Sequence, residues 1–185
     1  MSNSPPETLE LPRGVLVRLR ESHSDLMSAA VLASLDHLKP WMPWASVEAG
    51  SPAAQRERCQ AVQESWASGS DYNYALLTDE SGPAIGGFGL HRRIDPGGIE
   101  IGYWMHVDYV GQGYATAAAA ALTKAGLALA DVTRVEIHTD EANVKSAAIP
   151  QRLGYRLDRI FEREPEAPAE SGRIQVWISG ESSQA

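Results

Sequence analysis

Two glycines separated by one residue precede an alanine-rich stretch, and this arrangement suits the binding of an anion. Gly111-Gln112-Gly113 is followed by Tyr114-Ala115-Thr116 and then by the run Ala117–Ala121. Glycine adopts backbone angles that other residues avoid, and it brings no Cβ toward a ligand. A helix that begins directly after such a turn has unpaired amide N–H groups and a partial positive charge at its first turn. The segment therefore predicts a site for the phosphate of a phosphorylated cofactor.

Two common phosphate-binding motifs do not fit this segment. A Walker A loop would continue with Lys and Ser or Thr, and no such pair follows Gly113. A dinucleotide fingerprint would have a third glycine where Thr116 stands, within an early strand–turn–helix unit. The preceding residues 99–107 instead have the pattern of a β-strand, and an ordinary glycine-rich turn before a core helix is the plain alternative.

The run from Glu100 to Thr116 resembles the acyl-CoA-binding core of the GCN5-related N-acetyltransferases, the GNAT superfamily. Glu100-Ile101-Gly102-Tyr103-Trp104 followed by the glycine loop is most similar to the branch that acetylates the N-termini of ribosomal proteins and to its small-molecule-acetylating relatives. The resemblance covers about residues 15–178, and its specific motifs lie within 99–154. It implies acetyl-CoA as co-substrate, without a metal. The implied cofactor contacts are Met105, His106, Val107, Val110, Gly111, Gln112, Gly113, Tyr114, Ala115, Thr116, Asn143 and Ser146.

The implied reaction is acyl transfer from a CoA thioester to an amine, which requires that the amine lose a proton. Glu100 is the candidate base, since it is the only carboxylate in the apolar strand 99–105 and family members place a glutamate there near the acceptor amine. The alternative is a solvated residue that faces outward. An α-amine has a pKa near 8, so about a tenth of it is neutral at pH 7 and it needs little help.

Asn143 and Ser146 form a second constellation. In the resembling branch an Asn and a Ser at this spacing line the cofactor arm, and the serine is placed near the thioester sulfur as a proton donor. The compatible alternative is that both residues cap a helix. Tyr114 is a further candidate donor, although its position in the glycine loop favours packing. Val110 departs from the family pattern, which commonly has a larger residue there, so one pyrophosphate contact is expected to be missing.

Two tryptophans, Trp41 and Trp44, lie in a short predicted connection between helices. Exposing both is costly, and they could form a wall of an acceptor pocket, to which Tyr103 would contribute. The alternative is an apolar plug over the edge of the core. The spacing of the histidines suggests no metal site.

Composition and charge narrow the partners. The 185 residues carry a net charge of −8, which disfavours nucleic acid and anionic membranes and favours amines. One cysteine, Cys59, excludes an internal disulfide and a cysteine-based metal site. We expect a cytoplasmic protein, and a homodimer stays open. The acceptor is a protein N-terminal α-amine or a small-molecule amine, acetylated by direct transfer in a ternary complex. The alternative function is a non-catalytic acyl-CoA sensor.

The predicted fold is α+β, with one GNAT-like domain over residues 11–178 between flexible segments 1–10 and 179–185. About seven strands form a mixed, mostly antiparallel sheet, and about four helices cover it. Predicted helices include 24–35, with Ser24 as its N-cap, and one that begins at Ser51-Pro52. A third, over 143–153, is expected to be kinked or short because Pro150 lies inside it.

Overall fold

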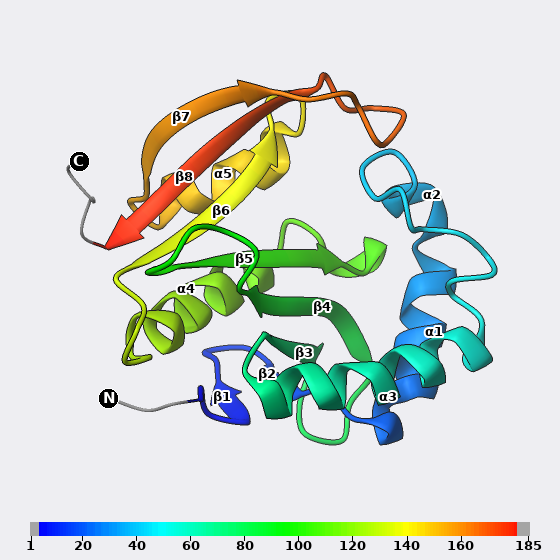
Figure 1. Ribbon diagram of the computed structural model, residues 1–185. Helices are drawn as coiled ribbons and strands as arrows, with labels where there is room; N and C mark the ends of the chain where they lie inside the picture. Colours follow the sequence, from blue (N-terminus) through cyan, green and yellow to red (C-terminus); the bar gives the residue numbers. More distant parts are fainter. Residues whose placement is uncertain (1–3, 181–185) are drawn as a thin grey trace.

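One eight-stranded sheet organises the protein (Figure 1). The structure, a computed structural model, describes residues 4–180. Along the sheet the strands lie in the order β1-β2-β3-β4-β5-β6-β8-β7. All neighbours are antiparallel except β5 and β6. The strands are β1 (Thr8–Glu10), β2 (Val15–Arg18), β3 (Asp71–Leu77), β4 (Ala84–His91), β5 (Gly98–Met105), β6 (Arg134–Asp140), β7 (Arg156–Glu162) and β8 (Arg173–Gly180).

The single parallel pairing is short, and it opens the middle of the sheet. β5 and β6 pair over three residues each, ending at Glu100 and Glu136. Beyond this point β5 pairs only with β4, and β6 only with β8. Figure 1 shows the two strands diverging. The facing backbone edges of both strands are therefore left without a strand partner from Ile101 onward.

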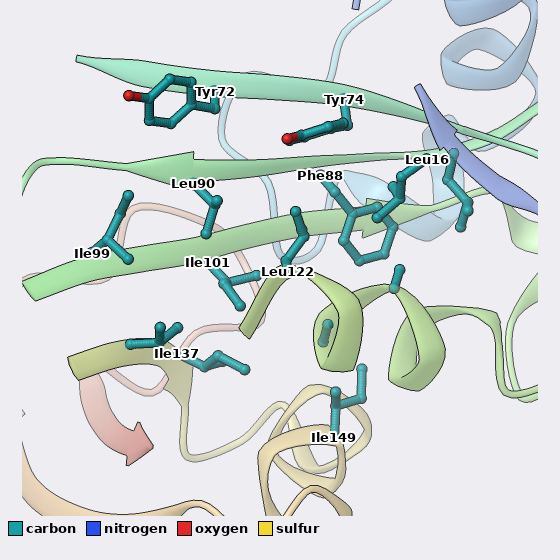
Figure 2. Packing of buried hydrophobic residues seen from close by; sticks show 14 of the residues in the cluster. Leu16, Tyr72, Tyr74, Phe88, Leu90, Ile99, Ile101, Leu122, Ile137 and Ile149 are labelled. Carbon is teal, nitrogen blue, oxygen red and sulfur yellow. The ribbon is translucent and has the colours of Figure 1, made fainter. Parts of the chain in front are cut away.

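Helices cover both faces of the sheet. They are α1 (Ser24–Ala33), α2 (Leu35–Leu38), α3 (Pro52–Ser68), α4 (Tyr114–Leu127) and α5 (Val144–Arg152), with short 3-10 turns η1 (Glu21–His23) and η2 (Val107–Tyr109). The alanines of α4 let it approach the sheet closely, and Figure 2 shows its Leu122 beside Ile101 of β5. A second buried cluster joins α1 and α3 to the opposite face. Within residues 4–180 no helix is long and apolar enough to cross a membrane.

Local signals explain several element boundaries. The Ser51 side chain accepts a hydrogen bond from the Ala54 amide at 3.3 Å, so α3 begins at the predicted cap and proline. α5 contains Pro150 and ends at Arg152, so it is short, as predicted. Ser24, by contrast, is not an N-cap: it is a buried first residue of α1, and His23 precedes it as the cap.

The predicted fold class is confirmed, but the boundaries of the domain were drawn too narrowly. Thr8–Glu10 pairs with β2, so these residues are not a flexible segment. Glu7 supports this strand by ion pairs to Arg18 and Arg20 at 2.7 and 2.6 Å. Gly180 still belongs to β8. Residues 1–3 and 181–185 of the two predicted flexible segments lie outside the described residues.

Candidate active site

The glycine loop has the geometry of an open anion site. Gly111 and Gly113 have φ angles of 74° and 87°, which favour glycine, and a Cβ at either would meet nothing within 4 Å. Gly113 is the N-cap of α4 and makes no side-chain cap. The Ala117 amide donates to the Gly113 carbonyl at 3.0 Å. The three amides before it, those of residues 114–116, have no intrahelical acceptor, so they are available to a phosphate.

Side chains of the loop brace its own backbone. The Gln112 Nε2 donates to the Asp108 carbonyl at 2.7 Å, and the His106 Nδ1 accepts from the Asp108 amide at 3.1 Å. The Tyr114 ring packs edge-on against Tyr109 at 6.0 Å, with the Arg13 guanidinium 5.5 Å above it. This arrangement matches the packing interpretation of Tyr114. The amides of the loop, more than its side chains, face the open space.

The opposite side of the β5–β6 opening is formed by the first turn of α5. The Asn143 Oδ1 accepts from the Ser146 amide at 3.1 Å, so Asn143 caps the helix. The Ser146 hydroxyl is not used for capping and lies 3.1 Å from the Tyr103 hydroxyl. Burial raises the pKa of Tyr103 to about 12, so its hydroxyl stays protonated at neutral pH. The Tyr103 and Ser146 hydroxyls therefore form a hydrogen-bonded pair.

A cavity of about 800 Å³ brings the predicted groups together. Its lining includes Trp41, Trp44, Glu100, Tyr103 and Ser146. Trp44 is 40% exposed and meets the buried Trp104 edge to face, with ring centroids 6.1 Å apart. The tryptophans thus line the cavity and are not sealed into the core. Tyr103 lies beside the Ser146 hydroxyl, which places it at the junction of the cavity and the β5–β6 opening.

Glycines on β4 and β5 form part of the cavity lining. Gly87, Gly89 and Gly102 all line the cavity. A Cβ at Gly87 would collide with the Trp104 indole, and one at Gly89 would collide with the His91 ring. The Trp104 and His91 rings therefore occupy the space that a side chain at these glycines would take.

A network of charged side chains, in which the carboxylates are buried, lies beside this lining. Arg93 donates twice to Glu100, from Nε to Oε2 at 2.8 Å and from Nη2 to Oε1 at 2.6 Å. The Glu100 side chain is only 8% exposed, so the alternative of a solvated, outward-facing residue does not hold. The His138 Nδ1 lies 3.8 Å from Glu100 Oε2, and its Nε2 lies 2.7 Å from Glu136 Oε2.

Glu136 is the carboxylate of this charged network that stays ionised. Its side chain is fully buried, and the Arg134 Nε donates to it at 2.8 Å. Burial alone would raise the pKa of Glu136, but hydrogen bonds from His138 and Arg134 outweigh it and lower the pKa to about 2. The carboxylate is therefore charged throughout the physiological range.

Sequence reasoning missed Arg93 and His138 as site residues. Glu136 and His138 are two apart in a strand, so they share one face of the sheet, and Glu136 pairs with Glu100 in the neighbouring strand. That alternation was a usable signal once the two strands were known to be neighbours. Arg93 follows β4 in a turn, where no periodic pattern applies.

The loop between β7 and β8 covers one end of the cavity. Its residues Arg163, Glu166 and Glu170 line the space. Asp140 anchors the loop by accepting from the Ser171 and Gly172 amides at 3.0 Å. The Ala169 amide donates to the Pro40 carbonyl at 2.9 Å, which joins this loop to the segment after α2 (Figure 1). Two distant parts of the chain thus meet above the cavity.

The histidines near the cavity form ion pairs and hydrogen bonds, and not a metal centre. His91 Nδ1 lies 2.9 Å from Asp71 Oδ1, and burial lowers the pKa of His91 more than this partner raises it. Among residues 4–180 no group of three or more His, Cys, Asp or Glu side chains is placed to hold a metal ion. Cys59 is buried and unpaired, and its burial raises the pKa of its thiol.

Known structures share this architecture. RimJ from Mycobacterium smegmatis, in complex with CoA-disulfide, superposes with a TM-score of 0.85 at 20% identity, covering 96% of this chain and 90% of that chain. The ribosomal-protein-S5-alanine acetyltransferase from Vibrio fischeri gives 0.84 at 15%, with 96% and 98% covered. The microcin C7 self-immunity acetyltransferase MccE, in complex with acetyl-CoA and AMP, gives 0.81 at 14%, with 96% and 98% covered. At these identities the likeness shows the fold.

The sequence itself matches the family model of the acetyltransferase (GNAT) domain over residues 13–156, more than half of the chain. No curated protein matches it. The matched segment contains the glycine loop, the β5–β6 opening and the first turn of α5. The chain therefore belongs to the GNAT acetyltransferase family, as its sequence predicts.

Proposed function

We propose that the protein transfers an acetyl group directly from acetyl-CoA to a primary α-amine that enters the cavity. The main support for this proposal is the place where the cavity meets the opening between β5 and β6. There the hydroxyl pair of Tyr103 and Ser146 lines the same cavity as Trp41 and Trp44. A ternary complex follows from this arrangement, because both substrates can meet without an acyl-enzyme intermediate.

The proposed cofactor contacts are mainly backbone groups. The free amides of residues 114–116, with the partial positive charge of the α4 N-terminus, suit the pyrophosphate. Asn143, Met105, His106, Val107 and Val110 stay predictions as contacts. The unpaired edge of β5 from Ile101 to Met105 offers donors and acceptors to the pantetheine arm.

The acceptor is proposed to be a protein N-terminus or a small molecule that presents an α-amine. Two similar structures are a RimJ and a ribosomal-protein-S5-alanine acetyltransferase, which supports a protein N-terminus. MccE is an immunity enzyme against microcin C7, which supports a smaller acceptor. The protein's net charge of −8 favours a cationic acceptor such as an α-amine. About a tenth of an α-amine is uncharged at pH 7, so a reactive fraction is already present.

Ser146 is the proposed proton donor to the CoA thiolate. The amine nitrogen attacks the thioester carbonyl carbon, a C–N bond forms and the C–S bond breaks. The departing sulfur takes the Ser146 hydroxyl proton. The Tyr103 hydroxyl, held protonated by burial, lies 3.1 Å from the serine oxygen and fixes its orientation.

Glu100 has two candidate roles, base and positioning residue. As a base it would have to accept a proton on a carboxylate that already receives two charge-assisted hydrogen bonds from Arg93. A role in positioning neighbouring groups is compatible with both hydrogen bonds from Arg93. The geometry therefore favours positioning, and the role of base stays a prediction.

Release of free CoA from acetyl-CoA, measured with a panel of amines, tests the function. Peptides with N-terminal Ala or Ser, an aminoacyl nucleotide analogue and a polyamine make a suitable panel. We expect release with at least one α-amine and none without an amine. Binding of acetyl-CoA without release by any amine would support the sensor alternative. A cytoplasmic location and a homodimer stay predictions from the sequence.

A further inference from the structure

The proposed reaction leaves one proton without an obvious acceptor. An acceptor amine with a pKa near 8 enters mostly as an ammonium ion at neutral pH and must be deprotonated before it attacks. Glu100 lines the cavity, but both of its oxygens are engaged by Arg93. Another group that reaches the same space is therefore needed.

His138 has a nitrogen free for this purpose. A carboxylate only accepts hydrogen bonds, so the contact between His138 Nε2 and Glu136 Oε2 at 2.7 Å requires that Nε2 carry the hydrogen. In the neutral ring Nδ1 then has the lone pair. No hydrogen bond within residues 4–180 uses Nδ1, and His138 lines the cavity with a side chain that is 18% exposed.

Charged groups lie at both ends of the imidazole ring. Glu136, buried and anionic, lies at one end of the imidazole, and Glu100 Oε2 lies 3.8 Å from Nδ1 at the other end. Three arginines partly offset the negative charge of these two carboxylates. Arg93 binds Glu100, Arg134 binds Glu136, and the Arg159 Nη2 lies 3.7 Å from Glu136. From β7, the Phe161 ring meets the imidazole edge to face at 6.3 Å.

We propose that His138 Nδ1 removes the proton from the acceptor ammonium, with Glu136 holding the ring in the required tautomer; this rests on the proposed function. The ammonium gives one proton to Nδ1, and the neutral amine attacks the thioester carbon. The nitrogen loses a second proton as the amide forms. This proton replaces the hydroxyl proton that Ser146 gives to the CoA thiolate. The imidazolium, stabilised between Glu136 and Glu100, returns its proton to solvent.

The pH dependence of His138→Gln tests the proposal. We expect kcat/KM for an N-terminal alanine peptide to fall by about a hundredfold at pH 6.5 and by less than about fivefold at pH 9.5, where the amine is already neutral. Glu100→Gln is the matched comparison. Because Glu100 is proposed to be a positioning residue, Glu100→Gln should lower kcat/KM by the same factor at both pH values. His23→Gln, in η1 and outside the cavity, is the control and should leave the rate unchanged.

Several results would overturn the assignment. A loss for His138→Gln that is equal at both pH values, or no loss, removes His138 as the base. A pH-dependent loss in Glu100→Gln alone would return that role to the glutamate. His138→Asn replaces His138→Gln if the latter shows no cooperative unfolding transition. Failure of the wild type to release CoA with any amine would instead contradict the proposed function.

Discussion

The proposed cofactor side and the proposed acceptor side of this candidate active site are built from different groups, backbone on one side and side chains on the other. The cofactor side is a stretch of backbone: glycines with positive φ angles and amides at the start of α4, without a charged side chain at its centre. The acceptor side is built from side chains of β5, β6, α5 and two connecting loops. It contains a network in which the buried carboxylates Glu100 and Glu136 contact arginines and His138.

This contrast separates what is common to the fold from what is particular to the chain. A site made of amides depends on a few glycines and on one helix start, so we expect it to persist at low sequence identity. The similar structures share only 14–20% of their residues with this protein and yet superpose at TM-scores of 0.81–0.85. A site made of charged side chains changes with each substitution, so we expect this part to determine which acceptor binds.

The largest effect is expected from a charge placed at the glycine loop. Gly113→Glu would put a carboxylate in the open space before α4, where the phosphate is proposed to bind, and we expect acetyl-CoA affinity to fall at least about a hundredfold. Calorimetric titration measures this directly. A ligand at a hundred times its Kd adds about 2.7 kcal/mol to stability, so the thermal shift with acetyl-CoA should disappear as well.

Gly113→Ala is the control for that variant. It introduces the backbone strain of φ 87° without the charge, and a Cβ there has free space. We expect it to lose less affinity than Gly113→Glu. If the glutamate variant binds acetyl-CoA as the wild type does, the loop is not the phosphate site.

Acid should weaken the acceptor side before the cofactor side. The pKa of Glu136 is lowered from 4.5 to about 2 in the folded protein, so its contribution to stability is complete above pH 4.5 and is lost as the pH falls toward 2. The shift corresponds to about 3 kcal/mol. We expect the free energy of unfolding of Glu136→Gln to depend less on pH over this range than that of the wild type.

Urea denaturation at several pH values measures the difference. Asp131→Asn is the matched control, because Asp131 is 67% exposed in its ion pair with Arg92 and should contribute little. Equal pH slopes for the wild type and Glu136→Gln would show that the buried network does not hold this side together.

At the junction of the two sides, Ser146→Ala should lower kcat by about tenfold to a hundredfold, because the thiolate loses its proton donor. Acetyl-CoA affinity should stay within about threefold, since the Asn143 cap uses the Ser146 amide and not its hydroxyl. Tyr103→Phe should have a smaller effect of the same kind. Steady-state kinetics with calorimetric binding separates the two quantities, and an unchanged kcat in Ser146→Ala would exclude the donor role.

The smallest of these effects is expected at the tryptophans. Trp41→Ala and Trp44→Ala should each raise the acceptor KM by about tenfold, from the loss of roughly 1–2 kcal/mol of stacking and apolar contact. Acetyl-CoA affinity should stay within about threefold. Val47→Ala is the control, because Val47 is 65% exposed in the same connection. Loss of acetyl-CoA binding in both tryptophan variants would assign these residues to the core instead.

The sequence predicted the local geometry of the glycine loop better than the charged contacts beside the cavity, for a physical reason. Gly111, Gly113 and the alanine run act through local backbone geometry, which neighbouring residues determine. His138 and Arg93 acquire a role only through contacts with Glu100 and Glu136, and these depend on strand order. The strand Thr8–Glu10 was missed because it has three residues, of which only Leu9 is apolar and packs on the core.

The hydrogen bond from the Ala169 amide to the Pro40 carbonyl has a consequence for the size of molecule that can react. It is one bond across the mouth of the cavity, and a single bond of this kind contributes only about 1 kcal/mol. We expect a slender chain end to pass these two segments more easily than a bulky rigid amine, so turnover should be faster with the slender acceptor.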